Sequence, residues 1–191
     1  MIILLNGPPG CGKDTIGRMM HKLIPGSAMY KMSSQLKNGL CELLGLDLKL
    51  WVTYLSNDWK DEPFDFIETT TTPREALIRL SEDYVKPLFG EDFFGHQAVR
   101  MMKGLAARHI IVTDTGFTTE VRPIVQGYGK ANVRVLQIHR PGFGFASDSR
   151  DYIDVDALGL EPYWKMLNNN HDLDILEAQV KRVLVEWKLH D

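Results

Sequence analysis

A chain of 191 residues, 44% of them hydrophobic, is long enough to bury a substantial core, most simply as one α/β domain with insertions. A formal net charge of −3, with no run of Lys or Arg, argues against a protein that coats a nucleic-acid polymer. Cys11 and Cys41 lack metal-ligand spacing, and the opening apolar run is too short for a signal peptide or a membrane span, so free thiols, no membrane partner and a cytoplasmic location are expected.

The N-terminal segment 2–15 joins an apolar run to a glycine-rich loop and then to a helical pattern. Gly7, Gly12 and Lys13 fit the Walker A pattern, in which backbone N–H groups surround a phosphate and the Lys ammonium reaches its oxygens. An ordinary Gly/Pro turn would account for the spacing, but not for the strand and helix patterns on either side. The residues predicted to surround a nucleotide's phosphates are Gly7, Gly10, Cys11, Gly12, Lys13, Asp14 and Thr15.

Asp14 stands where the Walker A pattern usually has the Ser or Thr that binds Mg²⁺, and Thr15 follows one place later. A carboxylate is itself a ligand that Mg²⁺ accepts, either directly or through a bound water. The sequence leaves both arrangements open, and in either one Asp14 is predicted to be a metal ligand.

The chain next predicts a short strand at 28–32 and a helix from Leu36 to Gly45. Lys37 lies in the first turn of this helix, where the dipole does not favour a cation, and a solvated surface lysine is the commoner explanation. Residues 47–71 are polar and aromatic, and we interpret them as an excursion from the core that serves as a substrate flap. Its aromatic side chains either stack on a bound base or cover a small core of the flap itself.

The sequence Thr-Pro-Arg-Glu at 72–75 predicts a helix start with a capping box. This start does not explain Arg74, because a guanidinium at a helix N-terminus is electrostatically misplaced unless an anion lies nearby. Lys86 follows near the end of this helix, and residues 90–107 predict another amphipathic helix.

Residues 109–114 form an apolar run that ends in Asp114, the pattern of a buried parallel strand that delivers a carboxylate to the ligand-binding edge of a sheet. Asp114 is therefore predicted on the metal or phosphate side of the site, and a cap for the helix that starts near Thr118 is the alternative. A fourth strand at 133–139 runs directly into Arg140.

Between residues 140 and 170 the Gly, Ser, Asp and Tyr content predicts a mobile lid, with Arg140 and Arg150 as its phosphate-facing cations. A helix from about 172 to 187 ends the chain. The predicted fold is a three-layer α/β sandwich built on a parallel sheet of about five strands. These strands are expected near residues 2–6, 28–32, 109–114, 133–139 and 164–168.

In this order, the motifs resemble those of the phage-type deoxynucleoside monophosphate kinases, P-loop kinases related to the adenylate kinases, and the resemblance covers most of the chain. It rests on Gly-Lys-Asp-Thr at 12–15, Thr-Pro-Arg-Glu at 72–75, Gly-Glu-Asp at 90–92, Asp114 with Phe117, Arg-Pro-Gly at 140–142 and Asn-Asn at 169–170. The resemblance implies one P-loop kinase domain over residues 1–191, with a substrate-binding insertion at about 33–107 and a lid at about 140–170.

Members of this family transfer the γ-phosphoryl group of ATP to a deoxynucleoside monophosphate, so the resemblance implies both nucleotides as partners and Mg²⁺ as cofactor. Such chemistry needs in-line positioning and cations that neutralise developing charge, which this inventory of residues offers. The implied catalytic residues are Lys13, Arg140, Arg150 and Asp114; the implied metal ligands are Asp14 and Asp114; the implied monophosphate ligands are Lys37, Arg74 and Lys86.

Other nucleotide-binding classes fit less well. The chain lacks the Asn-Lys-x-Asp motif of a switch GTPase, and Thr115 follows Asp114 where a motor or remodelling ATPase usually has a catalytic carboxylate. A P-loop kinase of another small molecule and a non-catalytic nucleotide-binding module remain alternatives. Pairing of two copies into a homodimer is also left open by the sequence.

Overall fold

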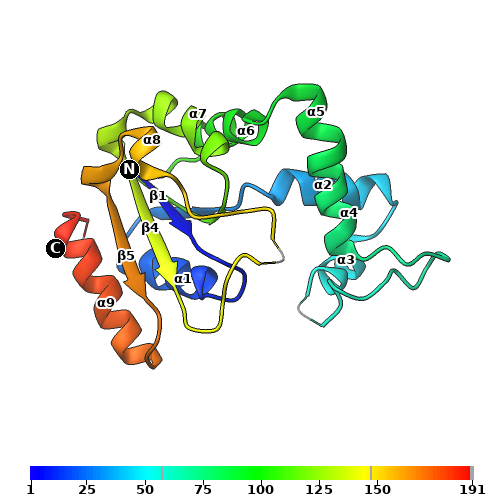
Figure 1. Cartoon of the computed structure of the whole chain (residues 1–191), viewed down its shortest axis with the longest axis horizontal. Helices are drawn as coiled ribbons and strands as arrows, with labels where there is room; N and C mark the ends of the chain where they lie inside the picture. The colour runs from blue at the N-terminus through cyan, green and yellow to red at the C-terminus, as the bar shows by residue number, and fades with distance from the viewer. Residues whose placement is uncertain (57, 147, 190–191) are drawn as a thin grey trace. The chain divides into compact units, whose positions relative to one another are not determined.

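The computed structural model describes residues 1–56, 58–146 and 148–189 (Figure 1). The chain divides into two compact units. The first consists of Met1–Met32 and Phe94–Asp191, and the second of Ser33–Phe93.

The first unit is built on a parallel β-sheet, which within the described residues has five strands in the order β2-β3-β1-β4-β5. Its strands are β1 (Ile2–Asn6), β2 (Ser27–Tyr30), β3 (His109–Thr115), β4 (Val133–His139) and β5 (Trp164–Asn168). Every residue of β1 is buried, as expected of a central strand covered on both faces. The predicted five-stranded parallel sheet is confirmed, and only β2 ends earlier than the sequence suggested.

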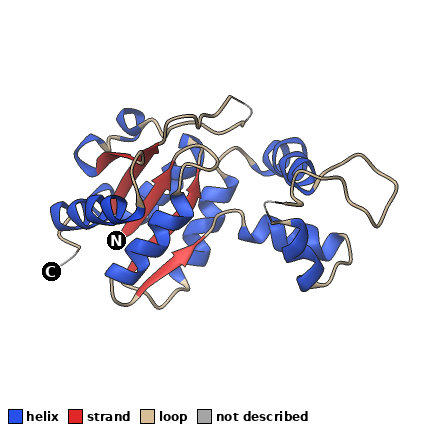
Figure 2. Cartoon of the chain, turned by 90° about the horizontal axis from the view of Figure 1, so that it is seen from below, coloured by secondary structure: helices blue, strands red, loops and turns tan. Residues whose placement is uncertain are grey.

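Helices cover both faces of this sheet, which gives the predicted three layers (Figures 1 and 2). One face carries α1 (Lys13–Leu23) and α9 (Leu173–Glu186), whose apolar sides pack on alternate strand residues such as Ile3 and Leu5. The other face carries α6 (Phe93–Lys103), α7 (Thr118–Tyr128) and the short α8 (Val155–Leu158). Two short 3₁₀ turns, Lys130–Asn132 and Glu161–Tyr163, lead into β4 and β5.

The position of β1 fixes the location of the glycine-rich loop. Because β1 lies between β3 and β4, with Leu4 in register with Val112 on one side and Val135 on the other, the strand order reverses at β1. Ligands of open parallel sheets bind at such a switch point, beyond the carboxyl ends of the strands. The segments that follow β1, β3, β4 and β5 therefore meet at one edge.

The second unit is helical. It contains α2 (Ser34–Leu43), α3 (Leu48–Tyr54), α4 (Pro73–Arg79), the π-helix η1 (Leu80–Val85) and α5 (Lys86–Phe89). The capping box predicted at the start of α4 is present, with the Thr72 side chain accepting from the Glu75 N–H and the Glu75 carboxylate accepting from the Thr72 N–H.

Aromatic residues form the core of the second unit. Trp51 and Tyr54 are 1% and 2% exposed, and the Tyr54 ring meets the edge of Phe64 at 5.1 Å between centroids. Of the two roles left open for the flap aromatics, these two residues therefore fill the unit's own core. Trp59, at 41% exposure, does not share it.

Candidate active site

The loop between β1 and α1 has the backbone that a phosphate site requires. Gly10 and Gly12 adopt φ angles of 76° and 106°, in the left-handed region that favours glycine. A side chain at Gly12 would also meet the Asn169 amide nitrogen at 2.5 Å. That amide donates to the Cys11 carbonyl oxygen at 2.8 Å, so Asn169 holds the loop from the segment that follows β5.

Lys13 lies curled into this loop. Its Nζ donates to the carbonyl oxygens of Gly7 at 2.6 Å and Pro8 at 2.7 Å, and lies 3.8 Å from the Cys11 sulfur. Burial lowers the pKa of Lys13 and raises that of the Cys11 thiol. Both cysteines are free, as expected. The ammonium is thus held at the mouth of the loop by neutral acceptors.

Asp14 and Thr15 lie in the first turn of α1. Asp14 Oδ1 forms an ion pair at 2.9 Å with Nζ of Lys31, the residue that follows β2. Burial alone would raise the pKa of Asp14, but the hydrogen bond and charge of Lys31 outweigh it and hold that pKa below its ordinary value. Thr15 Oγ1 accepts from the Arg18 guanidinium at 3.4 Å. The loop's carboxylate is therefore ionised at neutral pH and close to a cation.

Asp114 lies near the carboxyl end of β3, as predicted. Its Oδ1 accepts from the Met32 backbone N–H at 2.8 Å, so it ties the segment after β2 to the edge of the sheet. The N-cap residue of α7 is Phe117, whose side chain makes no capping hydrogen bond, so Asp114 does not occupy the N-cap position itself.

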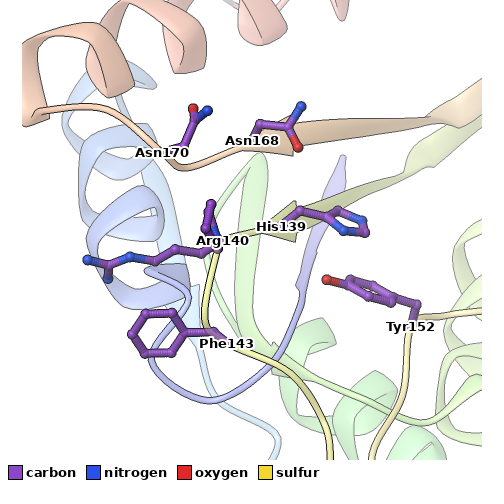
Figure 3. A pocket seen from close by; sticks show the side chains of 7 residues that line it. His139, Arg140, Phe143, Tyr152, Asn168 and Asn170 are labelled. Atoms are coloured by element: carbon purple, nitrogen blue, oxygen red, sulfur yellow. The ribbon is translucent and has the colours of Figure 1, made fainter.

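Arg140, the first residue after β4, reaches the glycine-rich loop. Its guanidinium donates to the Gly10 carbonyl oxygen at 3.0 Å and lies over the Phe143 ring at 4.7 Å. Beside it is an open groove of about 280 Å³ lined by His139, Arg140, Phe143, Tyr152, Asn168 and Asn170 (Figure 3). The rings of His139 and Tyr152 stack at 4.3 Å on one side of this groove.

Arg150 lies on the returning part of the same loop. Its guanidinium forms a two-pronged ion pair with the Asp148 carboxylate, with Nε 2.7 Å from Oδ1. That hydrogen bond raises the pKa of Arg150, and the charges of Asp114 and Glu120 act in the same direction. Burial lowers the pKa of Lys13, and the positive charge of Arg150 lowers it further, so the two cations repel each other.

The three residues predicted at a monophosphate, Lys37, Arg74 and Lys86, all belong to the second unit. Arg74, in the first turn of α4, pairs with Asp61 through both Nε and a terminal nitrogen. Lys86 is 2% exposed, and its Nζ lies 2.9 Å from Glu82 Oε1 one turn earlier. Lys37 is half-buried near the start of α2. The anion that the sequence required beside Arg74 is thus supplied by the protein.

Sequence reasoning missed several residues that organise this edge of the sheet. Asn6, fully buried at the end of β1, donates to the carbonyl oxygens of Thr115 and Asp151 and accepts from the Ile153 N–H. Lys31 belongs to no recognised motif, and Asn169 was noted only as part of the resemblance to the deoxynucleoside monophosphate kinases. Polarity at the very end of an apolar strand was the one available signal for Asn6.

No family model and no curated protein sequence matches the chain. Among solved structures, a thymidylate kinase from Candida albicans matches with a TM-score of 0.51 and 13% identity, over 100% of this chain and 93% of that one. A sugar kinase from Janibacter sp. matches at 0.48 and 13%, over 100% and 98% of the two chains, and a tunicamycin resistance protein from Deinococcus radiodurans at 0.46 and 14%, over 97% and 94%. At these identities the thymidylate kinase match concerns the fold alone, and the chain has the α/β fold of the P-loop kinases.

Proposed function

We propose that this protein transfers the γ-phosphoryl group of ATP to a deoxynucleoside 5′-monophosphate, giving ADP and the diphosphate. The observation that carries the proposal is the position of Lys13, whose Nζ is bonded to Gly7 and Pro8 carbonyl oxygens at the mouth of a left-handed glycine loop. An ammonium held there meets the β and γ oxygens of a bound triphosphate.

In this proposal the adenine of ATP lies in the groove beside the loop. The Phe143 ring offers a flat surface to a base, and the amides of Asn168 and Asn170 offer donors and acceptors to its edge. The groove adjoins Gly10, through the Arg140 hydrogen bond, so base and phosphates fit one continuous ligand.

The donors at the loop fit a magnesium ion. Among the described residues no three His, Cys, Asp or Glu side chains gather into a metal site, but Mg²⁺ beside a nucleotide takes one or two carboxylates and completes its shell with phosphate oxygens and waters. Asp14 and Asp114 would supply these carboxylates. When bound, the ion neutralises charge on the phosphates.

In this proposal, cationic side chains of the protein bind the phosphates and neutralise charge in the transition state. Lys13 holds the β and γ oxygens, while Arg140 and Arg150 neutralise charge that builds up on the transferred group. Such a reaction needs little covalent chemistry, so aligned cations and exclusion of water account for most of the acceleration. The predicted lid spans residues 140–170. Within it, residues 155–158 form α8 and residues 164–168 form β5. Arg140 and Arg150 both lie in the loop before α8.

The acceptor's phosphate is assigned to Lys37, Arg74 and Lys86 of the second unit. Arg74 and Lys86 hold carboxylates in the described structure, so a substrate phosphate must exchange with Asp61 to reach the Arg74 guanidinium. Two N–H groups directed at one carboxylate show that Arg74 can present a fork, and a phosphate accepts the same fork.

Steady-state ADP formation with a panel of acceptors tests this function. We expect turnover with at least one deoxynucleoside monophosphate, and none above background with Lys13→Ala. Turnover with sugars or coenzyme precursors but no nucleotide would identify a kinase of another small molecule. ATP binding without turnover on any acceptor would leave a nucleotide-binding module and contradict the proposal.

A further inference from the structure

Gly116, in the turn between β3 and α7, is surrounded by the side chain of Arg150. A β-carbon built on Gly116 would lie 2.5 Å from Arg150 Cγ and 2.7 Å from its Cβ, closer than non-bonded carbons approach, and Cδ is also in contact. Arg150 Cβ can move aside only with the backbone, and Cγ only by a rotation about the Cα–Cβ bond that redirects the whole side chain. The absence of a side chain at Gly116 is therefore a condition for this position of Arg150.

The backbone conformation at Gly116 does not require a glycine. Its φ angle is not among the positive values that favour glycine elsewhere in the chain, as at Gly10 and Gly12. An alanine could adopt the same conformation, and the three atoms nearest to its methyl group would all belong to Arg150. The residue is buried, so no exposed route is open to a new methyl group.

The backbone around Arg150 is tied to the sheet at the same place. The Asp151 N–H donates to the Gly116 carbonyl oxygen at 3.0 Å, and the Asn6 amide joins the Thr115 and Asp151 carbonyl oxygens at 3.1 and 3.0 Å. The Ile153 N–H donates to Asn6 Oδ1 at 2.9 Å. This end of the loop is thus fastened to the ends of β1 and β3, beside the glycine-rich loop.

The guanidinium is directed by a separate contact. Asp148 accepts from the Arg150 backbone N–H at 3.0 Å and from Nε at 2.7 Å, which fixes the head group relative to its own backbone. The Arg150 side chain is 26% exposed, and its charge acts on Lys13 and is acted on by Asp114. Three supports therefore hold it: space at Gly116, the Asn6 clamp and the Asp148 pair.

We propose that Gly116 is a positioning residue for Arg150, which it keeps seated beside the phosphate site before any ligand binds. The inference rests on the proposed function, because it takes phosphoryl transfer as the reaction that Arg150 serves. It also changes the expectation for the lid, because Arg150 does not have to be carried in by closure.

The test is a double-mutant cycle of Gly116→Ala and Arg150→Gly, measured by kcat, by the KM for ATP and by Tm. Gly116→Ala is expected to lower kcat at least about tenfold, and Arg150→Gly about 10²-fold, as for a cation acting in the transition state. The KM for ATP should change less than about threefold in Gly116→Ala, because the loop that holds the phosphates is untouched. Gly39→Ala, where a methyl group meets nothing within 4 Å, is the matched control and should retain wild-type kcat.

The double variant decides the proposal. If Gly116 acts through Arg150, the kcat of the double variant is no lower than that of Arg150→Gly. Gly116→Ala should then also leave Tm unchanged when it is added to Arg150→Gly, because the arginine side chain that it would displace is gone. Multiplied losses of kcat, a wild-type kcat in Gly116→Ala, or a wild-type kcat in Arg150→Gly would each overturn it.

Failure of the proposed function gives a different result. In that case wild-type protein forms no ADP with any acceptor, and only the Tm values of the four proteins in the cycle test whether Gly116 positions Arg150. If Gly116→Ala lowered Tm equally in the wild-type protein and in Arg150→Gly, the positioning role would be overturned.

Discussion

Two cations at the glycine-rich loop, Lys13 and Arg140, differ from two cations of the second unit, Arg74 and Lys86, in what they bond. Lys13 and Arg140 donate to backbone carbonyl oxygens, which carry only partial charge. Arg74 and Lys86 instead pair with carboxylates that carry a full charge, from Asp61 and Glu82. A phosphate displaces a carbonyl readily, but it must compete with a carboxylate on nearly equal terms. Lys13 and Arg140 are thus already arranged for an anion, whereas Arg74 and Lys86 must exchange a partner.

Loss of Lys13 should have the largest effect at the glycine-rich loop. Lys13→Ala is expected to lower kcat about 10³-fold or more while the fold persists, because its ammonium serves the phosphates and not the core. Lys22→Ala removes an exposed lysine from the last turn of the same helix and should leave kcat unchanged. Retention of more than about a tenth of kcat in Lys13→Ala would contradict the assignment.

The arginines that follow β4 come next. At least one of Arg140→Ala and Arg150→Ala should lower kcat by about 10²-fold, because each cation acts chiefly on charge that develops in the transition state. Arg182→Ala, on the exposed side of α9, is the matched control.

Hydrogen exchange across residues 140–154 tests closure separately. It should slow when ATP and acceptor are both bound, and more strongly before Arg150 than after it, because the Asn6 clamp already protects the later residues. If neither variant loses kcat and exchange is unaffected by ligands, the segment is a static loop.

The second unit is tested by separating Arg74 from its carboxylate. Arg74→Ala should raise the KM for the monophosphate about tenfold with little change in that for ATP, because it removes one forked, charge-assisted contact. Asp61→Ala removes the competitor and should leave that KM unchanged or lower it. If the two variants have the same effect, Arg74 serves only to pair with Asp61.

Much of the fold follows from local patterns. Apolar runs located the strands, and Thr-Pro-Arg-Glu located the start of α4 together with its capping box. The contacts that shape the site join residues far apart in the chain, such as Asn6 with Ile153 or Gly116 with Arg150. No periodicity or spacing encodes such pairs, because they depend on which strand ends meet at the switch point. The sequence analysis therefore named single side chains and not the pairs that they form.

Asp14 and Lys31 give the smallest expected effect, because both side chains are about half exposed and solvent weakens their attraction. Here the carboxylate predicted to bind the metal meets a cation. If Asp14 holds the metal, Asp14→Asn should raise the half-saturating Mg²⁺ concentration, and Lys31→Ala should lower it about twofold to threefold by removing a competitor. Shifts in the same direction for both variants would contradict a metal role for Asp14.

The most direct test of the central claim follows the phosphoryl group itself. ATP labelled in its γ-phosphate is mixed with excess enzyme, Mg²⁺ and each deoxynucleoside monophosphate, and the products are separated within one turnover. The account predicts label on a deoxynucleoside diphosphate with wild-type protein and label left on ATP with Lys13→Ala. Label found only on inorganic phosphate, or remaining on ATP with every acceptor, would contradict it.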